Sequence, residues 1–164
     1  MFLKSMRYEI IDNFLPADQF KILQDFIFGM DIDWTFLDGV ANPGDGYYQF
    51  VHVFYTNFRP QTRFFDVLTP IIQKIDPISI VRIKANLLIR TPEIIQHPFH
   101  TDVDDCVTAI YYVNSNNGKT IFKNGMEVES VENRLLVFDS NEMHTGTTCT
   151  DVLRRSVINF NYHL

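Results

Sequence analysis

The chain has 164 residues, of which 46% are hydrophobic and 21% charged, and its formal net charge at pH 7 is −6. This length and composition predict a single domain, residues 1–164, that is large enough to bury its own core. The negative charge argues against a protein that grips nucleic acid independently of sequence, because such a protein needs a surface rich in Lys and Arg.

The sequence also argues against a membrane span and a disulfide framework. No apolar stretch approaches the roughly 20 residues that cross a bilayer, and residues 1–7 contain no apolar segment of the kind found in a secretory signal. Cys106 and Cys149 stand apart in the sequence and fit reduced thiols. We therefore expect a cytoplasmic protein, a monomer or weak homo-oligomer, with neither nucleic acid nor a membrane as a partner.

The first half of the chain begins with a predicted strand and a predicted helix. Residues 7–12 form the strand, and Pro16 lies near the first turn of the helix, where a missing backbone N–H costs nothing. Gly29 follows as the expected C-terminal cap. The apolar residues between them recur at helical spacing, and they are Phe20, Leu23, Phe26 and Ile27.

A glycine-rich loop separates this helix from a second one. Residues 38–46 contain three of the seven glycines and are expected to form a flexible loop. A strand at residues 47–55 follows directly, so the loop is either a lid over a site or an ordinary long turn. The second helix is expected at residues 60–74, where Pro70 either kinks it or restarts it.

The second half of the chain reads as short strands joined by turns. Residues 106–114 are rich in β-branched and aromatic side chains and predict a strong strand. The remaining predictions are one or two strands at 78–90, strands at 135–138 and 156–162, a connection at 91–99, a turn at 115–118 and an Asn-Gly hairpin turn at 124–125. Helices followed by strands predict an antiparallel sandwich or barrel, with a helix-containing part at 1–77 packed on a strand-rich core at 78–164.

Three residues of the second half form a candidate metal site. His100 and Asp102 are two residues apart, so on an extended chain their side chains point to the same side. His144 follows an apolar strand about forty residues later and is the candidate third ligand. Two His and one carboxylate are the facial triad of non-heme Fe(II) oxygenases, which leaves three coordination positions open.

The neighbouring polar residues are weaker candidates. His97 precedes Asp102 by five residues, and Pro98 redirects the chain between them. Asp104 and Asp105 are expected in a turn. Arg154 and Arg155 follow His144 by ten and eleven residues, and a guanidinium at the start of a strand can present its fork to the carboxylate of a co-substrate.

These motifs resemble the Fe(II)/2-oxoglutarate-dependent dioxygenases, in particular their prolyl 4-hydroxylase-like branch. The resemblance covers about residues 80–162 well and the first eighty only loosely. The matching stretches are His100-Thr101-Asp102, residues 106–114, 118–122 and 133–139, His144 and the Arg-led final strand, with Asn13-Phe14-Leu15-Pro16 resembling the start of such domains. The resemblance implies a double-stranded β-helix, or jelly roll, with the N-terminal helices packed on the larger sheet.

The resemblance also assigns roles. It implies that His100, Asp102 and His144 bind Fe(II), and that Tyr112 and an arginine bind the far carboxylate of 2-oxoglutarate. We favour Arg155 over Arg154. If Arg155 faces inward, the residues that face outward and give the helices an apolar surface are Ile158, Phe160 and Tyr162. The alternative, Arg154 facing inward, would place Ser156 beside it.

One position departs from the family pattern. Relatives with this Ile-Tyr-Tyr strand carry a further co-substrate tyrosine ten residues before the first iron histidine, and here that position is Arg90. The implied activity is hydroxylation of an unactivated C–H bond with Fe(II), 2-oxoglutarate and O2. A peptidyl proline in a peptide or protein is the leading substrate by this analogy.

Three alternatives remain open. The chain could act on a small metabolite as an oxygenase of the same kind. It could be a catalytically silent jelly-roll binding or scaffold module. It could also be a cupin-like enzyme that uses another metal without 2-oxoglutarate, in which case neither Arg154 nor Arg155 would be needed for activity.

Overall fold

The computed structural model describes residues 8–164. The absence of a secretory signal was predicted for residues 1–7, which lie outside the described residues. The helical segments are α1 (Ala17–Phe28), the 3-10 helix η1 (Phe65–Leu68) and α2 (Thr69–Ile75). The strands are β1 (Tyr8–Ile11), β2 (Thr35–Asp38), β3 (Tyr48–Thr56), β4 (Arg59–Pro60), β5 (Ser79–Ile89), β6 (Val107–Tyr112), β7 (Asn116–Phe122), β8 (Glu127–Ser130), β9 (Arg134–Asp139), β10 (His144–Gly146) and β11 (Arg154–His163).

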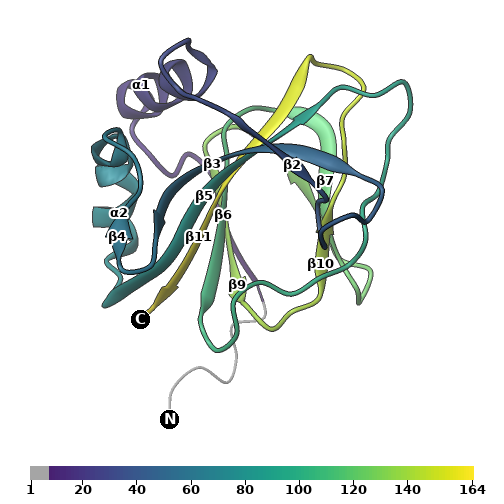
Figure 1. Cartoon of the computed structure of the whole chain (residues 1–164). Helices are drawn as coiled ribbons and strands as arrows, with labels where there is room; N and C mark the ends of the chain where they lie inside the picture. The colour runs from purple at the N-terminus through teal and green to yellow at the C-terminus, as the bar shows by residue number, and fades with distance from the viewer. Residues whose placement is uncertain (1–7) are drawn as a thin grey trace.

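The described strands form two antiparallel sheets. The larger has eight strands in the order β1-β9-β6-β11-β5-β3-β2, with β4 paired to β3, and the smaller has the order β10-β7-β8. In Figure 1, α1 and α2 cover one face of the larger sheet, and the smaller sheet lies across from its other face. This is the jelly roll with helices on the larger sheet that the sequence predicts. In the described part of the chain, no helix is both long and apolar enough to cross a membrane.

The two faces of the larger sheet differ in what they bury. The outer face packs under the helices, where Ile158, Phe160 and Tyr162 share one apolar cluster with Leu23 and Ile27 of α1. A second, smaller cluster fills part of the space between the sheets, and its buried members are Ile110, Tyr112, Phe122, Val128, Leu136, Phe138 and Val157. Alternate residues of β11 therefore enter different cores, as period-2 alternation requires.

The two helices begin and end for identifiable reasons. Helix α1 directly follows Pro16 and ends at Gly29, both as predicted. The predicted helix at 60–74 is wrong at its start, because Arg59 and Pro60 pair with β3 and the helical backbone begins only at Phe65. Pro70 lies in the first turn of α2, where its missing N–H has no helical partner to lose. It therefore restarts the helix.

Besides β4, three further short strands were not predicted, namely β2, β8 and β10. They have three or four residues each, too few for a clear alternation, and β8 and β10 are defined by pairing with β7. The predicted turn at 115–118 is wrong, because β7 already begins at Asn116 and includes Gly118. The hairpin turn at Asn124 and Gly125 is confirmed between β7 and β8, with Gly125 at φ 89°.

Asn133 ties the start of α1 to the larger sheet. Its side chain accepts from the backbone N–H of Leu15 at 2.9 Å and donates to the Leu15 carbonyl at 2.8 Å. The hydroxyl of Tyr111 also donates to it, at 2.7 Å, and the residue is buried with φ at 60°. One amide thus satisfies a backbone segment and a buried hydroxyl together.

Asn133→Gly should destabilise the fold by about 3 kcal/mol, because glycine keeps the positive φ but leaves three buried groups without partners. Urea unfolding measures this loss. The matched control is Asn57→Gly, since Asn57 is exposed at φ 51° and should change stability by only about 0.5 kcal/mol. Equal losses in the two variants would contradict a structural role for the Asn133 amide.

Candidate metal centre

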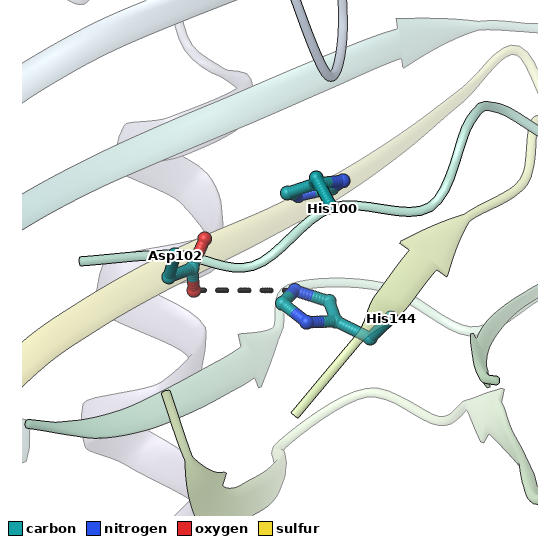
Figure 2. Close-up of side chains that lie close together, drawn as sticks. All are labelled: His100, Asp102 and His144. Carbon is teal, nitrogen blue, oxygen red and sulfur yellow. Dashed lines mark ion pairs between the residues drawn. The ribbon is translucent and has the colours of Figure 1, made fainter. Parts of the chain in front are cut away.

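The structure brings His100, Asp102 and His144 to one point (Figure 2). Each offers one ligand atom, and these atoms all lie within 4.8 Å of one another. The two histidines face each other across an isolated antiparallel bridge, with reciprocal backbone hydrogen bonds of 2.9 Å. Because His144 opens β10 and β10 pairs with β7, the smaller sheet holds one ligand while the segment before β6 holds the other two.

Backbone carbonyls set the orientation of both imidazoles. Nδ1 of His144 lies 2.9 Å from the carbonyl oxygen of Glu142, and Nδ1 of His100 lies 3.4 Å from that of Pro98. A carbonyl only accepts, so each Nδ1 carries a hydrogen, and in the neutral form of each ring Nε2 is the nitrogen with the free lone pair. Nε2 of His144 in turn lies 3.9 Å from a carboxylate oxygen of Asp102. This is the tautomer that a metal-binding histidine needs.

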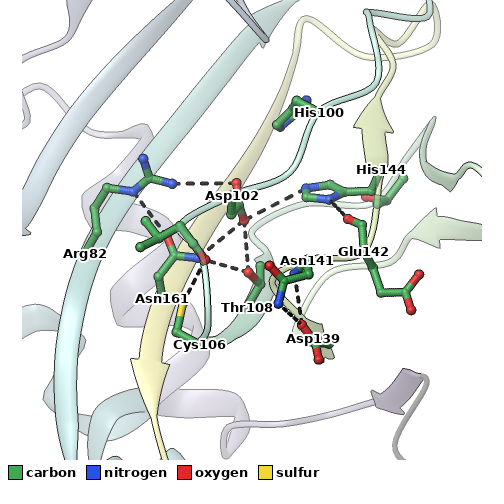
Figure 3. Close-up of polar contacts among 12 residues, drawn as sticks. Arg82, His100, Asp102, Cys106, Thr108, Asp139, Asn141, Glu142, His144 and Asn161 are labelled. Atoms are coloured by element: carbon green, nitrogen blue, oxygen red, sulfur yellow. Dashed lines mark hydrogen bonds and ion pairs between the residues drawn. The ribbon is translucent and has the colours of Figure 1, made fainter.

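A polar network holds the Asp102 carboxylate (Figure 3). The hydroxyl of Thr108 donates to it at 3.1 Å and the amide of Asn161 at 3.4 Å, while a guanidinium nitrogen of Arg82 lies 3.6 Å away. Arg82 also donates to the Asn161 side chain at 3.1 Å, so the supporting groups hold one another. Such partners fix the direction of a ligating carboxylate and are typical of metal sites.

The ionisation of these groups suits a cation. Burial, together with the neighbouring His144, lowers the pKa of His100, so its imidazole is neutral near pH 7. Burial alone would raise the pKa of Asp102, but His144 and Arg82 outweigh it and the pKa lies below its usual value. A neutral imidazole and an ionised carboxylate are the forms that bind metal. The donor set therefore fits a divalent ion such as Fe(II).

Arg155 occupies the other end of the same cavity. It is only 4% exposed, and it donates to the Ser130 hydroxyl at 2.9 Å and to the Thr120 hydroxyl at 3.3 Å. No carboxylate within residues 8–164 pairs with it. Gly118 makes room for it, because a Cβ at that position would lie 2.7 Å from the Arg155 Cδ. A buried guanidinium without an anion is suited to binding the carboxylate of a ligand.

Arg154 lies on the opposite face of β11. Its guanidinium stacks 4.2 Å from the ring of Phe28 and donates to the carbonyl of the same residue at 3.4 Å, at the end of α1. The cavity-facing arginine is therefore Arg155, as the need for an apolar surface under the helices predicts. That it binds 2-oxoglutarate stays a prediction.

Tyr112 does not line the cavity. Its hydroxyl is fully buried and donates to Thr120 at 2.7 Å, and its ring lies 5.9 Å from the Arg155 guanidinium carbon. Burial raises its pKa, so the hydroxyl is neutral. Tyr112 thus supports Thr120, which does line the cavity, and a direct contact of Tyr112 with 2-oxoglutarate stays a prediction. Arg90 lies outside the cavity, just after β5, and is exposed.

The cavity has a volume of about 210 Å³. It contains His97, whose Nδ1 lies 3.1 Å from the Gly146 carbonyl and which is not part of the ligand group. Sequence reasoning missed the cavity-facing side chains of β5, which are Arg82, Lys84, Asn86 and Leu88. In the sequence, these residues are marked only by their alternation with apolar residues. A strand with one solvent-exposed face shows the same alternation. Burial, with help from the charge of Arg82, lowers the pKa of Lys84 to about 8.

The glycine-rich loop forms one wall of the cavity through Val40 and Ala41. Its shape is set by Asp45, whose carboxylate accepts backbone N–H groups of four loop residues, namely Val40, Ala41, Asn42 and Tyr47. Burial alone would raise the pKa of Asp45, but these hydrogen bonds together lower it to about 2. The loop is therefore internally organised. A role as a lid stays a prediction.

Solved structures of other proteins share this fold. A prolyl hydroxylase from Trichoplax adhaerens, in complex with a peptide of hypoxia inducible factor, has a TM-score of 0.65 at 13% identity, covering 94% of this chain and 83% of that one. A prolyl-4-hydroxylase from Pseudomonas putida has a TM-score of 0.56 at 16% identity, with coverages of 96% and 92%.

A third neighbour was solved with ligands. HygX from Streptomyces hygroscopicus, with nickel, 2-oxoglutarate and hygromycin B bound, has a TM-score of 0.63 at 9% identity, covering 95% of this chain and 82% of that one. No protein-family model matches the sequence, and no curated protein matches it either. At these identities the likeness establishes the fold alone, which this chain shares with the two prolyl hydroxylases and with HygX.

Proposed function

We propose that this chain is an Fe(II)- and 2-oxoglutarate-dependent dioxygenase that hydroxylates an unactivated C–H bond. One observation carries the proposal. A single cavity contains the three candidate ligands His100, Asp102 and His144 close together at one end, and the guanidinium of Arg155, which has no carboxylate partner among the described residues, at the other. A metal and a dicarboxylate are the two ligands that such an arrangement fits.

The roles of the residues follow from their contacts. His100, Asp102 and His144 would hold Fe(II), and Arg155 with the Thr120 hydroxyl would hold the far carboxylate of 2-oxoglutarate. With both bound, O2 oxidises 2-oxoglutarate to succinate and CO2 and a C–H bond of the substrate becomes C–OH. The side chains of Asp102 and His144 are each only 4% exposed, so the proposed ligands at this end of the cavity are shielded from bulk water.

The finer proposal concerns the substrate. A prolyl residue in a peptide or protein is the leading candidate, supported by the prolyl hydroxylases among the structural neighbours. A small metabolite is the second candidate. It is supported by the cavity volume of about 210 Å³, which is below the usual range for drug-sized ligands, and by a neighbour that was solved with hygromycin B.

We also propose a cellular location and a domain organisation for this chain. A reducing, cytoplasmic location is supported by Cys106 and Cys149, both buried and unpaired. A single domain is supported by the pairing of β3, from the first half of the chain, with β5 of the core.

The test is turnover of the co-substrate. In the presence of Fe(II) and O2, the protein should release succinate from 2-oxoglutarate slowly by itself and faster with a prolyl peptide, which should gain one oxygen by mass spectrometry. Anaerobic addition of 2-oxoglutarate to the Fe(II) protein should give the metal-to-ligand absorption band of an open iron site. Absence of both succinate and the band would favour the catalytically silent module instead.

A further inference from the structure

Strand β2 is an open edge of the larger sheet. It comes last in the order of that sheet, next to β3, and no other strand of residues 8–164 pairs with its far side. All four of its residues are exposed, Phe36 by 57% and Leu37 by 40%. The backbone N–H and C=O groups along such an edge are free to pair with another strand. The larger sheet can therefore accept one more strand at β2.

An aromatic cluster lies beside this edge, formed by Phe36, Tyr48 and Phe50. Their ring centroids are 5.7 to 6.4 Å apart, and Tyr48 is 50% exposed. Gln49 lines the cavity, so its neighbours on β3 point to the opposite side of the sheet. Phe50 also faces Leu87 of β5, which extends the apolar row by one strand. Exposed apolar surface beside an open edge is typical of a protein contact.

Strand β2 is complementary to a second copy of itself. Two identical strands pair in antiparallel fashion about a two-fold axis, and each side of the sheet stays on the same side in both copies. Because side chains alternate, this axis passes through a residue rather than between two. Only an axis at Phe36 or at Leu37 pairs three residues of β2 with three of the second copy.

The side chains of β2 favour the axis at Phe36. This register places Phe36 against Phe36 of the second copy, and Thr35 against Leu37. The axis at Leu37 would instead place the ring of Phe36 against Asp38, whose carboxylate would lose water without gaining a hydrogen-bond donor. An aromatic pair on the axis is favourable in addition to its buried area. The two aromatic clusters would then meet across the axis.

The contact that this register gives is small. Pairing of three residues from each copy, with the aromatic clusters, buries less than about 1,200 Å², which is the range of weak and transient interfaces. A dissociation constant on the order of 0.1 mM fits such an area. Each copy has a net charge of −6, so the like charges oppose association and salt should strengthen it.

We propose that the chain forms a weak two-fold dimer in which β2 pairs with β2 of a second copy. The outward backbone groups of β2 gain partners, and the two larger sheets join into one continuous sheet. β2 leads directly into the glycine-rich loop, whose Val40 and Ala41 line the cavity, so the dimer contact lies next to the candidate site. The inference does not depend on the proposed function.

Sedimentation equilibrium at high ionic strength tests the dimer, at protein concentrations around the expected dissociation constant. The parent should show a monomer–dimer equilibrium, and Phe36→Asp should weaken it by about tenfold or more because two carboxylates would meet on the axis. Phe58→Asp is the matched control. Phe58 is 93% exposed in the turn after β3, at a φ of 61° that aspartate tolerates. A monomeric parent, or equal weakening in both variants, would overturn the inference.

Cysteine substitution tests the register. Phe36→Cys should form a disulfide between two copies under mild oxidation, because directly facing Cβ atoms lie about 5 Å apart. Tyr48→Cys should not, although Tyr48 belongs to the same cluster, since the two β3 strands would be three strand spacings apart, about 14 Å. Cys106 and Cys149 are buried and should not compete. Equal cross-linking at both positions, or none at position 36, would contradict the pairing.

Hydrogen exchange locates the contact in the unmodified protein. The backbone N–H groups of β2 that point away from β3 should exchange more slowly at high protein concentration than at low concentration. Strand β1, at the opposite edge of the larger sheet, provides the control and should exchange equally at both. Protection that appears at β1 and not at β2 would place the contact at the wrong edge and overturn the inference.

Discussion

His100→Ala should abolish 2-oxoglutarate turnover. The variant keeps the backbone bridge to His144, so the fold is retained, but the metal loses one of three protein ligands. Loss of a group that merely supports a ligand typically costs about 10–100-fold in affinity, and loss of a ligand itself should cost more. Iron retained after desalting and succinate release measure the two effects.

His163→Ala is the control for this experiment, because His163 is exposed and its ring nitrogen bonds only Ser79 among the described residues. It should retain both iron and turnover. His97 lies in the cavity but is held by the Gly146 carbonyl, so it should not rescue His100→Ala. If His100→Ala released succinate at the parental rate, the assignment of the metal ligands would be wrong.

Arg155→Met should raise the KM for 2-oxoglutarate by about 30-fold or more, since truncating one partner of a buried charge pair costs about 2–5 kcal/mol. Iron binding should persist, because Arg155 is not among the three metal-binding residues. Methionine has a similar length and removes a buried charge that lacks a counter-ion, so the stability of the free protein should be maintained.

Arg154→Met provides a matched control on the other face of the same strand. It loses the contact with Phe28 but nothing in the cavity, so KM should stay near the parental value. The reverse result, with Arg154→Met raising KM and Arg155→Met silent, would assign the co-substrate to Arg154. Oxidation of a substrate that needs no added 2-oxoglutarate and is unchanged in both variants would favour an enzyme that does not use 2-oxoglutarate.

The parts of the site that could be predicted from the sequence obey local rules. His100 and Asp102 are two residues apart on an extended segment, and their shared direction follows from backbone geometry alone. The choice between Arg154 and Arg155 follows from alternation once the apolar positions of β11 are assigned to the helices. Both arguments need only neighbouring residues and one global fact, that helices cover one face of a sheet.

The parts that could not be predicted depend on contacts between distant segments. Arg82 and Lys84 alternate with apolar residues, as polar residues do on any half-exposed strand. Their face of the larger sheet lies inside the protein only because the smaller sheet covers it. The order of the glycine-rich loop depends on one carboxylate, Asp45, that gathers four separate backbone groups. The burial of Tyr112 depends on Thr120 from the facing sheet. None of these contacts between distant residues produces a periodic pattern in the sequence.

The bridge between His100 and His144 would couple the proposed metal binding to folding. In an unfolded chain these residues are about forty positions apart, and Asp102 lacks the hydroxyl of Thr108 and the amide of Asn161. An ion that binds only the folded chain adds to its free energy of unfolding, by about 2.7 kcal/mol when its concentration is a hundred times the dissociation constant. With the site as proposed, a larger supply of metal would raise the folded fraction and slow proteolysis that acts on the unfolded chain.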